Sequence, residues 1–219
     1  AALGAFAATP MELAGAYTAL LDGTAERPWL VSALSTASGE TLVQFEPDSK
    51  AVASSRAAAI ATDVLQGVLI RGTGARASGY GVKGGAGKTG TTDEYRDAWF
   101  VGYTPDLVVA VWVGKDKGTL GLSGSRAALP TWARFVAASG TSGHDFRRPE
   151  GLASADVCDT SGLIATADCE ATHAELFESG RVPTERCDLH SEPTVRVGQI
   201  LQGIFKRDKP PGKQRKRDR

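Results

Sequence analysis

A capping pattern followed by periodic apolar residues opens the chain. Thr9-Pro10-Met11-Glu12 has the composition of a helix start, because Thr is a good N-cap, Pro suits the first helical position and Glu completes a capping box. Gly23 is a favourable helix stop. The segment between them is predicted to be a helix, because its apolar side chains fall on one face: Leu13, Tyr17, Leu20 and Leu21.

Two later segments show the same spacing. Ser54 and Ser55 are candidate caps for a second helix, which runs to about Arg71 with apolar residues at intervals of four. A third helix is predicted over Ala127–Ala138. Its apolar face contains Leu129, Trp132 and Val136.

Strand-like runs predict two hairpins. Leu30–Ala37 and Thr41–Phe45 flank the turn residues Ser38-Gly39-Glu40, and Ala98–Tyr103 and Leu107–Val113 flank a Thr-Pro-Asp turn. The last of these runs is apolar throughout, which predicts a strand buried on both faces.

The order of these elements predicts the fold class. Residues 72–90 are rich in glycine and are expected to form a mobile loop between the second helix and the second hairpin. The sequence helix, hairpin, helix, loop, hairpin, helix predicts an α+β fold, or α/β in the broad sense, with an antiparallel sheet flanked by helices over residues 1–140. Periodicity then fades until Thr194–Phe205, so residues 141–205 are expected to form a small, loop-rich appendage that contains all three cysteines.

The composition is near the average for a globular protein, with 42% hydrophobic and 23% charged residues. No apolar run approaches the roughly 20 residues of a membrane helix, and no signal peptide is recognisable.

Residues 206–219 carry eight Lys or Arg against two acids, so the other 205 residues carry 17 against 23, a net charge of −6. We expect a disordered, solvated basic tail at 206–219 and no nucleic-acid partner.

Three glycine motifs overlap at residues 79–92. Gly79–Gly84 matches the G-x-G-x-x-G of dinucleotide-binding proteins, but no strand precedes it and no helix follows. Gly87-Lys88-Thr89 is similar to the end of a phosphate-binding loop, but Val82 stands where that motif needs its first Gly. Lys88-Thr89-Gly90 is the K-T-G triad of penicillin-recognising serine enzymes, a motif that lies on a strand at the edge of the active-site cleft, and the predicted strands that follow it fit that motif.

The residues around the triad carry a wider resemblance. GKTGTTDEYRDAWFVGYTPDLVVAVWVGKD closely resembles the transpeptidase domain of class A (bifunctional) penicillin-binding proteins. Further similar segments follow in order: LGAFAATPMELAGAYTALLDG upstream, GSRAALPTWARFV downstream, and the cysteine-containing region ending in CDLH. The resemblance spans Leu3 to His190. It implies an incomplete penicillin-binding-protein/serine β-lactamase-like transpeptidase fold.

The resemblance also implies an activity and a site. In that family, the Ser of an S-x-x-K motif attacks the D-Ala-D-Ala amide of a peptidoglycan stem peptide, and β-lactam antibiotics acylate the same Ser. Lys88 is implied to polarise this network, Thr89 to bind the substrate carboxylate and Gly90 to permit close packing. Thr91 is implied to offer its backbone N–H to the oxyanion, and Thr92 to lie at the edge of the substrate cleft. The location implied is the periplasmic face of the inner membrane, and no cofactor is expected.

The chain departs from the family pattern at the nucleophile. No Ser has Lys three positions later, and the absence of Asn from the sequence excludes an S-x-N motif. Both motifs precede the LGAFAATP-like segment in the family. We therefore expect this chain to be the C-terminal part of a longer protein with a glycosyltransferase domain and a membrane anchor, and to have no acyl-transfer activity alone. Two alternatives stay open: a non-catalytic cell-wall-binding module, and a fragment of a related β-lactamase or D,D-carboxypeptidase.

The cysteines allow a metal site or a disulfide. Cys158, Cys169 and Cys187 with His190 form a Cys₃His set, but the separations of 11 and 18 contain no C-x₂-C knuckle, so no metal is expected. The extracytoplasmic location implied by the resemblance favours a disulfide instead, most simply Cys169–Cys187, although the sequence leaves the pairing open.

Other polar and aromatic residues are interpreted as structural. Caps and turns are expected for the serines Ser54, Ser55, Ser123 and Ser125, and strand ends or loops for the acids Glu94 and Asp97. The core or the cleft wall is expected for the aromatic residues Trp99, Phe100 and Tyr103. The surface is expected for the histidines His144, His173 and His190.

Overall fold

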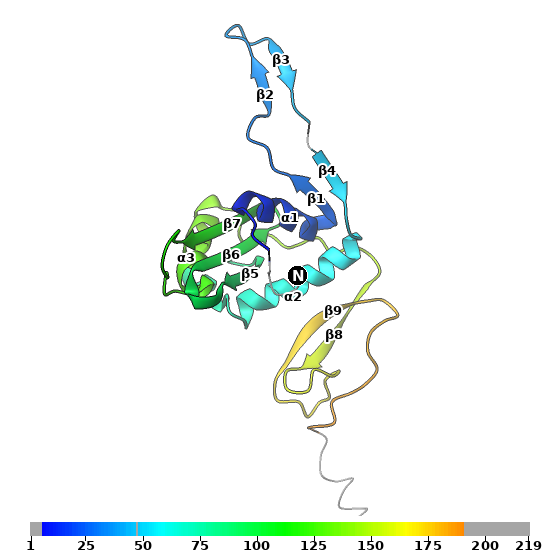
Figure 1. The fold of residues 1–219 in the computed structure, drawn as a ribbon. Helices are drawn as coiled ribbons and strands as arrows, with labels where there is room; N and C mark the ends of the chain where they lie inside the picture. Colours follow the sequence, from blue (N-terminus) through cyan, green and yellow to red (C-terminus); the bar gives the residue numbers. More distant parts are fainter. Residues whose placement is uncertain (1–5, 47, 191–219) are drawn as a thin grey trace, which may run out of the picture. The chain divides into compact units, whose positions relative to one another are not determined.

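A computed structural model describes residues 6–46 and 48–190 (Figure 1). The chain divides into two compact units: one comprises Ala1–Ser154 and Glu175–Val182, and the other Ala155–Ala174 and Pro183–Arg219. The domain limits predicted at residues 140 and 205 stay a prediction. The predicted periodic segment at 194–205 and the basic tail lie outside the described residues.

The first two predicted helices are confirmed together with their caps. Helix α1 is Pro10–Asp22, and Thr9 and Glu12 form the predicted capping box. Gly23 ends α1 in the left-handed conformation, with φ 99°. Helix α2 is Ser55–Ile70, and the Ser54 hydroxyl caps it by accepting the N–H of Ala57. None of the described helices combines the length and the apolar character needed to cross a lipid bilayer.

Two strand pairs follow one another between α1 and α2 and form a ribbon (Figure 1). Strand β1 (Thr24–Arg27) pairs antiparallel with β4 (Asp48–Ala51), and β2 (Ala33–Ser35) pairs with β3 (Thr41–Gln44). The β2–β3 pair is the predicted first hairpin, with a shorter first strand and a register irregularity between Leu34 and Ser35. The ribbon adds little to the core, because its large apolar residues are exposed: Trp29, Leu30, Val31, Leu34, Leu42, Val43 and Phe45.

The central sheet contains three antiparallel strands in the order β5-β6-β7. Strand β5 is Ala86–Thr91, β6 is Asp97–Thr104 and β7 is Leu107–Gly114, and the short 3₁₀ helix η2 (Asp93–Tyr95) connects the first two. The second predicted hairpin is therefore confirmed.

The predicted loop over residues 72–90 is wrong in part. This segment holds the 3₁₀ helix η1 (Ala75–Tyr80) and most of strand β5. Glycine is needed there for packing rather than for mobility. A Cβ atom on Gly87 would lie 2.8 Å from the Cα atom of Gly102 on the neighbouring strand.

The expected burial of β7 on both faces is also wrong. Strand β7 is half-buried along most of its length, and Trp112 is 42% exposed. Within the described residues, β6 is the only strand that pairs with β7, so one edge of β7 is left without a strand neighbour. A continuous apolar run therefore does not distinguish an edge strand from a central one.

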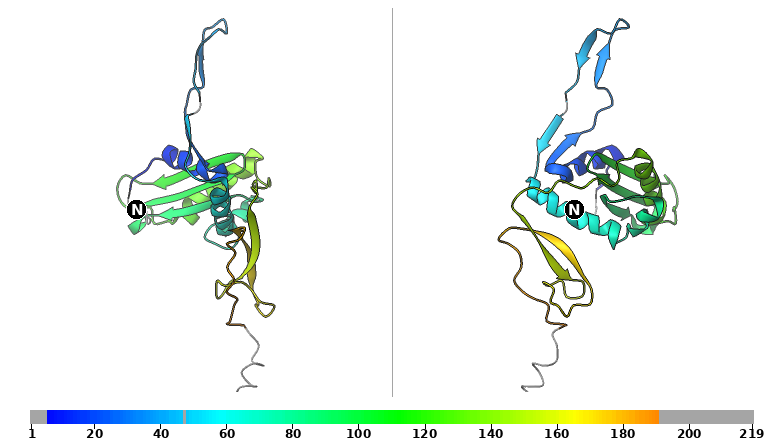
Figure 2. Two further views of the ribbon diagram at one scale, coloured as in Figure 1. Left: turned by 90° about the vertical axis from the view of Figure 1, so that its right-hand side faces the viewer. Right: turned by 180° about the vertical axis from the view of Figure 1, so that it is seen from behind.

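The core lies on the face of the sheet covered by α3 (Gly124–Ser139), which begins three residues earlier than predicted (Figure 2). Phe100 of β6 contacts Trp132 of α3, with ring centroids 4.8 Å apart. Tyr103 points to the opposite face, where it contacts Tyr17 of α1 edge-to-face at 6.2 Å. The α3-side core contains these buried residues: Leu69, Ala77, Val82, Phe100, Ala128, Leu129, Trp132, Ala133 and Val136.

The C-terminal part contains a strand pair that the sequence pattern does not predict. Strand β8 is Leu152–Cys158 and β9 is Thr172–Glu178, and the two pair in a separate sheet. The division between the two compact units runs through both strands.

Candidate functional site

The K-T-G triad lies on strand β5 at the edge of the central sheet (Figure 1). One side of β5 pairs with β6, where Lys88 is opposite Val101 and Thr89 is opposite Phe100. Within the described residues, no strand covers the other side of β5. Backbone N–H and C=O groups on that side have no strand partner and can therefore pair with an extended peptide.

Lys88 presents a positive charge at this edge. The side chain is exposed, and its ammonium group donates a hydrogen bond to the backbone carbonyl of Thr89 at 3.1 Å. No carboxylate in the described part of the chain forms an ion pair with it. The ammonium group is thus free to attract an anion.

The hydroxyl groups of the next two threonines are held by distant parts of the chain. Thr89 Oγ1 lies 2.8 Å from Thr73 Oγ1, in the segment after α2. Thr91 Oγ1 accepts the backbone N–H of Gly124 at 3.0 Å, where α3 begins. Both contacts were missed by sequence reasoning. Thr73 gave no signal within the glycine-rich segment, whereas Gly124 lies in the similar segment GSRAALPTWARFV.

Gly124 lets the start of α3 approach this edge closely. A Cβ atom on Gly124 would lie 2.4 Å from the carbonyl oxygen of Gly90 and 2.3 Å from that of Trp99. A side chain on Gly124 would therefore push the start of α3 away from β5. A Cβ atom on Gly90 would instead lie 3.1 Å from the Cβ atom of Trp99 on the neighbouring strand, and the packing role expected for Gly90 stays a prediction.

Thr92 is used by the connection between β5 and β6. Its hydroxyl accepts the N–H of Asp97 at 2.9 Å and donates to the Asp97 carboxylate at 3.2 Å. This is a structural role, and the substrate contact expected for Thr92 stays a prediction. Glu94 also acts locally, because it forms an ion pair with Arg96 at 2.7 Å.

The serines expected at caps and turns do occupy structural positions. Ser54 and Ser123 are the N-cap residues of α2 and α3. Ser125 lies in the first turn of α3, and its hydroxyl is 2.9 Å from that of Ser123.

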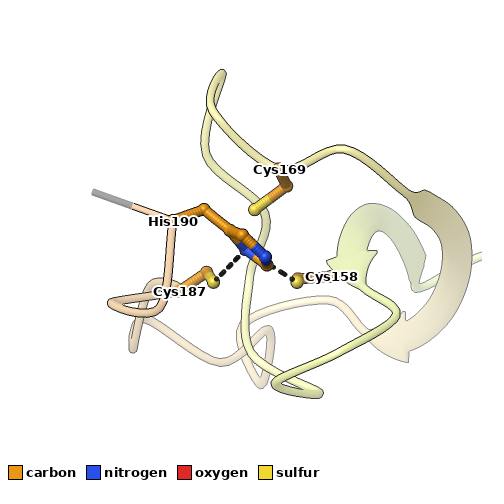
Figure 3. Close-up of side chains that lie close together, drawn as sticks. All are labelled: Cys158, Cys169, Cys187 and His190. Carbon is orange, nitrogen blue, oxygen red and sulfur yellow. Dashed lines mark hydrogen bonds between the residues drawn. The ribbon is translucent and has the colours of Figure 1, made fainter. Parts of the chain in front are cut away.

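The structure differs from the expected disulfide. Cys158, Cys169 and Cys187 are all free, so the Cys169–Cys187 bond is not formed. Their sulfur atoms instead converge with a ring nitrogen of His190, and all four atoms lie within 4.8 Å of one another (Figure 3). One expectation is corrected here, because His190 is half-buried among the sulfurs rather than at the surface. The four residues also form a potential metal-binding set, although the spacing of the cysteines did not predict a metal. The sequence signal that was overlooked is the C-x₂-H spacing of Cys187 and His190.

Two segments of the chain match families of known proteins. Residues 1–134 match the penicillin-binding protein transpeptidase domain, and this match covers more than half of the chain. The chain belongs to the penicillin-binding protein transpeptidase family. Residues 148–192, which include the cysteine cluster, match the penicillin-binding protein 1A, C-terminal domain.

Individual relatives agree with this family. Penicillin-binding protein 1A of Aquifex aeolicus is 35% identical over 197 residues, covering 87% of this chain and 27% of the relative. The protein of the same name from Neisseria gonorrhoeae is 33% identical over 227 residues, covering 89% of this chain and 28% of the relative. The chain thus spans less than a third of the length of these relatives.

A solved structure supports the fold. The crystal structure of penicillin-binding protein 1A from Haemophilus influenzae matches with a TM-score of 0.72 at 20% identity, covering 82% of this chain and 33% of that chain. The predicted fold class, an antiparallel sheet flanked by helices in the manner of penicillin-binding proteins, is confirmed.

Proposed function

We propose that this chain supplies the substrate-binding edge of a peptidoglycan D,D-transpeptidase. The observation that carries the proposal is the position of Lys88-Thr89-Gly90 on the open edge of β5, in a chain of the penicillin-binding protein transpeptidase family. The edge offers a positive charge, hydroxyl groups and free backbone groups. These are the groups needed to hold a peptide that ends in a carboxylate, such as a stem peptide ending in D-Ala-D-Ala.

The proposed reaction has two acyl-transfer steps. A serine hydroxyl adds to the carbonyl carbon of the D-Ala-D-Ala amide, the C–N bond breaks, and D-Ala leaves after accepting a proton. An amine of a neighbouring stem peptide then attacks the ester, forms the cross-link and returns the proton to the serine. In this scheme Lys88 and Thr89 hold the terminal carboxylate, and the Thr91 backbone N–H stabilises the oxyanion. β-Lactams acylate the same serine.

The chain contains no Ser-x-x-Lys, so the proposal places the nucleophile in residues outside the sequence considered. The protein would then act on the outer side of the cytoplasmic membrane, where stem peptides are cross-linked, with a membrane anchor and a glycosyltransferase domain also outside this sequence. The relatives found are penicillin-binding proteins 1A, which favours this proposal over a β-lactamase or a D,D-carboxypeptidase.

Labelling with a fluorescent penicillin tests the proposal. Residues 1–219 alone are expected to remain unlabelled, whereas the same residues preceded by those encoded upstream in frame are expected to be labelled. In the longer protein, Lys88→Ala should slow labelling by about 10- to 100-fold, because a hydrogen bond between charged groups contributes about 1.5–3 kcal/mol. Lys50→Ala, which removes an exposed lysine of β4, is the matched control and should label at the wild-type rate.

Three results would contradict the proposal. Labelling of residues 1–219 alone would show a nucleophile within this chain, and wild-type labelling of Lys88→Ala would remove the proposed role of the edge. Labelling of the longer protein only after cell lysis, with a penicillin that does not cross the cytoplasmic membrane, would contradict the proposed location. Retention of residues 1–219 on peptidoglycan, with no labelling of the longer protein, would favour the cell-wall-binding module.

A further inference from the structure

Four potential metal ligands from three separate segments meet in the second compact unit (Figure 3). Their ligand atoms are the Sγ atoms of Cys158, Cys169 and Cys187 and the Nδ1 atom of His190. None of these residues belongs to the proposed transpeptidase edge. The cluster therefore calls for an explanation of its own.

Backbone pairing, rather than sulfur chemistry, brings the segments together. Ile164 forms an antiparallel bridge with Val157 and a parallel bridge with Arg186, the residues just before two of the cysteines. Cys158 donates its N–H to Leu163 at 2.8 Å, and Cys187 donates its N–H to Ile164 at 2.8 Å. One short segment thus fixes two cysteines side by side.

The distances suit coordination to one ion. His190 Nδ1 lies 3.2 Å from Cys187 Sγ and 3.5 Å from Cys158 Sγ. A tetrahedral zinc ion with Zn–S bonds of about 2.3 Å separates its ligand atoms by about 3.8 Å. A disulfide would instead require two sulfurs about 2.05 Å apart, and all three cysteines are free.

The surroundings of the cysteines suit a shielded metal site. Cys169 Sγ accepts the backbone N–H of Thr166 at 3.3 Å. Cys158 and Cys187 are buried, so the ligands are shielded from solvent.

The second unit has a very small hydrophobic core. Among its described residues, the buried hydrophobic positions are Val157 and the two cysteines Cys158 and Cys187. A unit with so small a core usually needs a cross-link or a metal.

We propose that Cys158, Cys169, Cys187 and His190 bind one zinc ion in a structural site. Four protein ligands complete a tetrahedral shell and leave no open position for a substrate, so the ion stabilises the fold and does not take part in catalysis. A soft set of three thiolates and one imidazole selects zinc over magnesium or calcium.

Metal analysis of the purified protein, prepared without reductant or chelator, tests this site. We expect one zinc per chain by elemental mass spectrometry and three reactive thiols after denaturation with a chelator. Replacement of zinc by cobalt should give the intense visible absorption of a tetrahedral thiolate complex. These measurements on the unaltered protein do not depend on a variant that folds.

Variants then assign the ligands. Cys169→Ser and His190→Ala should each weaken zinc binding by more than about 100-fold. His144→Ala, at an exposed histidine paired with Asp106 in the other unit, should keep one zinc per chain. Absence of zinc from the unaltered protein would overturn the proposal, as would a mass two hydrogens lower that locates a Cys169–Cys187 disulfide. Full zinc affinity in His190→Ala would remove that residue from the site.

Discussion

At the residue scale, the proposed substrate edge depends on contacts from outside its own strand. Thr73 holds the Thr89 hydroxyl, and the Gly124 N–H holds that of Thr91. Among residues 6–46 and 48–190, Lys88 makes no comparable contact with another element, and its side-chain hydrogen bond is to the backbone of the next residue. The hydroxyl groups are therefore fixed in place, while the charge at the edge stays available to a ligand.

The capping box of α1 gives a residue-scale prediction about pH. The Glu12 carboxylate accepts the Thr9 N–H at 2.7 Å, and this hydrogen bond lowers the pKa of Glu12 below its usual 4.5. A lowered folded-state pKa adds stability that is fully present above pH 4.5 and is lost as the pH falls through the folded-state pKa. Glu12→Gln mimics the protonated form, so it should lower the free energy of unfolding at pH 7, and the loss should become smaller as the pH falls toward 3.

Urea unfolding of both proteins at the two pH values measures this difference. An equal effect of Glu12→Gln at pH 7 and pH 3 would mean that the carboxylate does not stabilise the helix start.

At the element scale, glycines let large aromatic rings fill the space between α3 and the sheet. A Cβ atom on Gly102 would lie 2.6 Å from ring atoms of both Phe100 and Trp132, which are fully buried. Gly124 plays the corresponding role where α3 crosses β5. At each of these contacts, a glycine without a side chain lies against a rigid ring or backbone group. The helix α3 therefore has little freedom to shift on the sheet.

Gly102→Ala is therefore expected to destabilise the protein by about 1–3 kcal/mol, the usual cost of overpacking a core. Gly79→Ala is the matched control, because a Cβ atom there would have no neighbour within 4 Å and the backbone has no positive φ. Its effect should stay within about 0.5 kcal/mol. Chemical denaturation measures the free energy of unfolding of both variants. An equal decrease in the two variants would show that the contact with Trp132 can relax.

At the scale of the whole molecule, local sequence signals predicted most helices and strands. Features that depend on contacts between remote segments were not predicted from the sequence pattern. The capping box at Thr9 and the apolar face around Trp132 are signals contained within one helix, and both helices formed as expected. The cysteine cluster depends on Ile164 bridging two remote segments, which spacing along the chain does not reveal. The glycines of strand β5, needed for close packing, give it the composition of a loop, and only the K-T-G motif places residues 88–91 on a strand edge.

The two compact units are expected to respond differently to loss of metal. If zinc replaces a hydrophobic core in the second unit, chelation should raise amide exchange by at least about tenfold in residues 155–174 and 183–190. Strands β5, β6 and β7 should stay protected, because buried aromatic residues hold them and no ligand lies among them. Hydrogen exchange with mass spectrometry resolves the two responses.

His190→Ala should exchange like the chelated protein with or without chelator, and added zinc should restore protection only in the protein with all four ligands. Unchanged exchange on chelation would show that the second unit is held together without the ion, and equal loss in β5–β7 would show that the metal stabilises the whole chain.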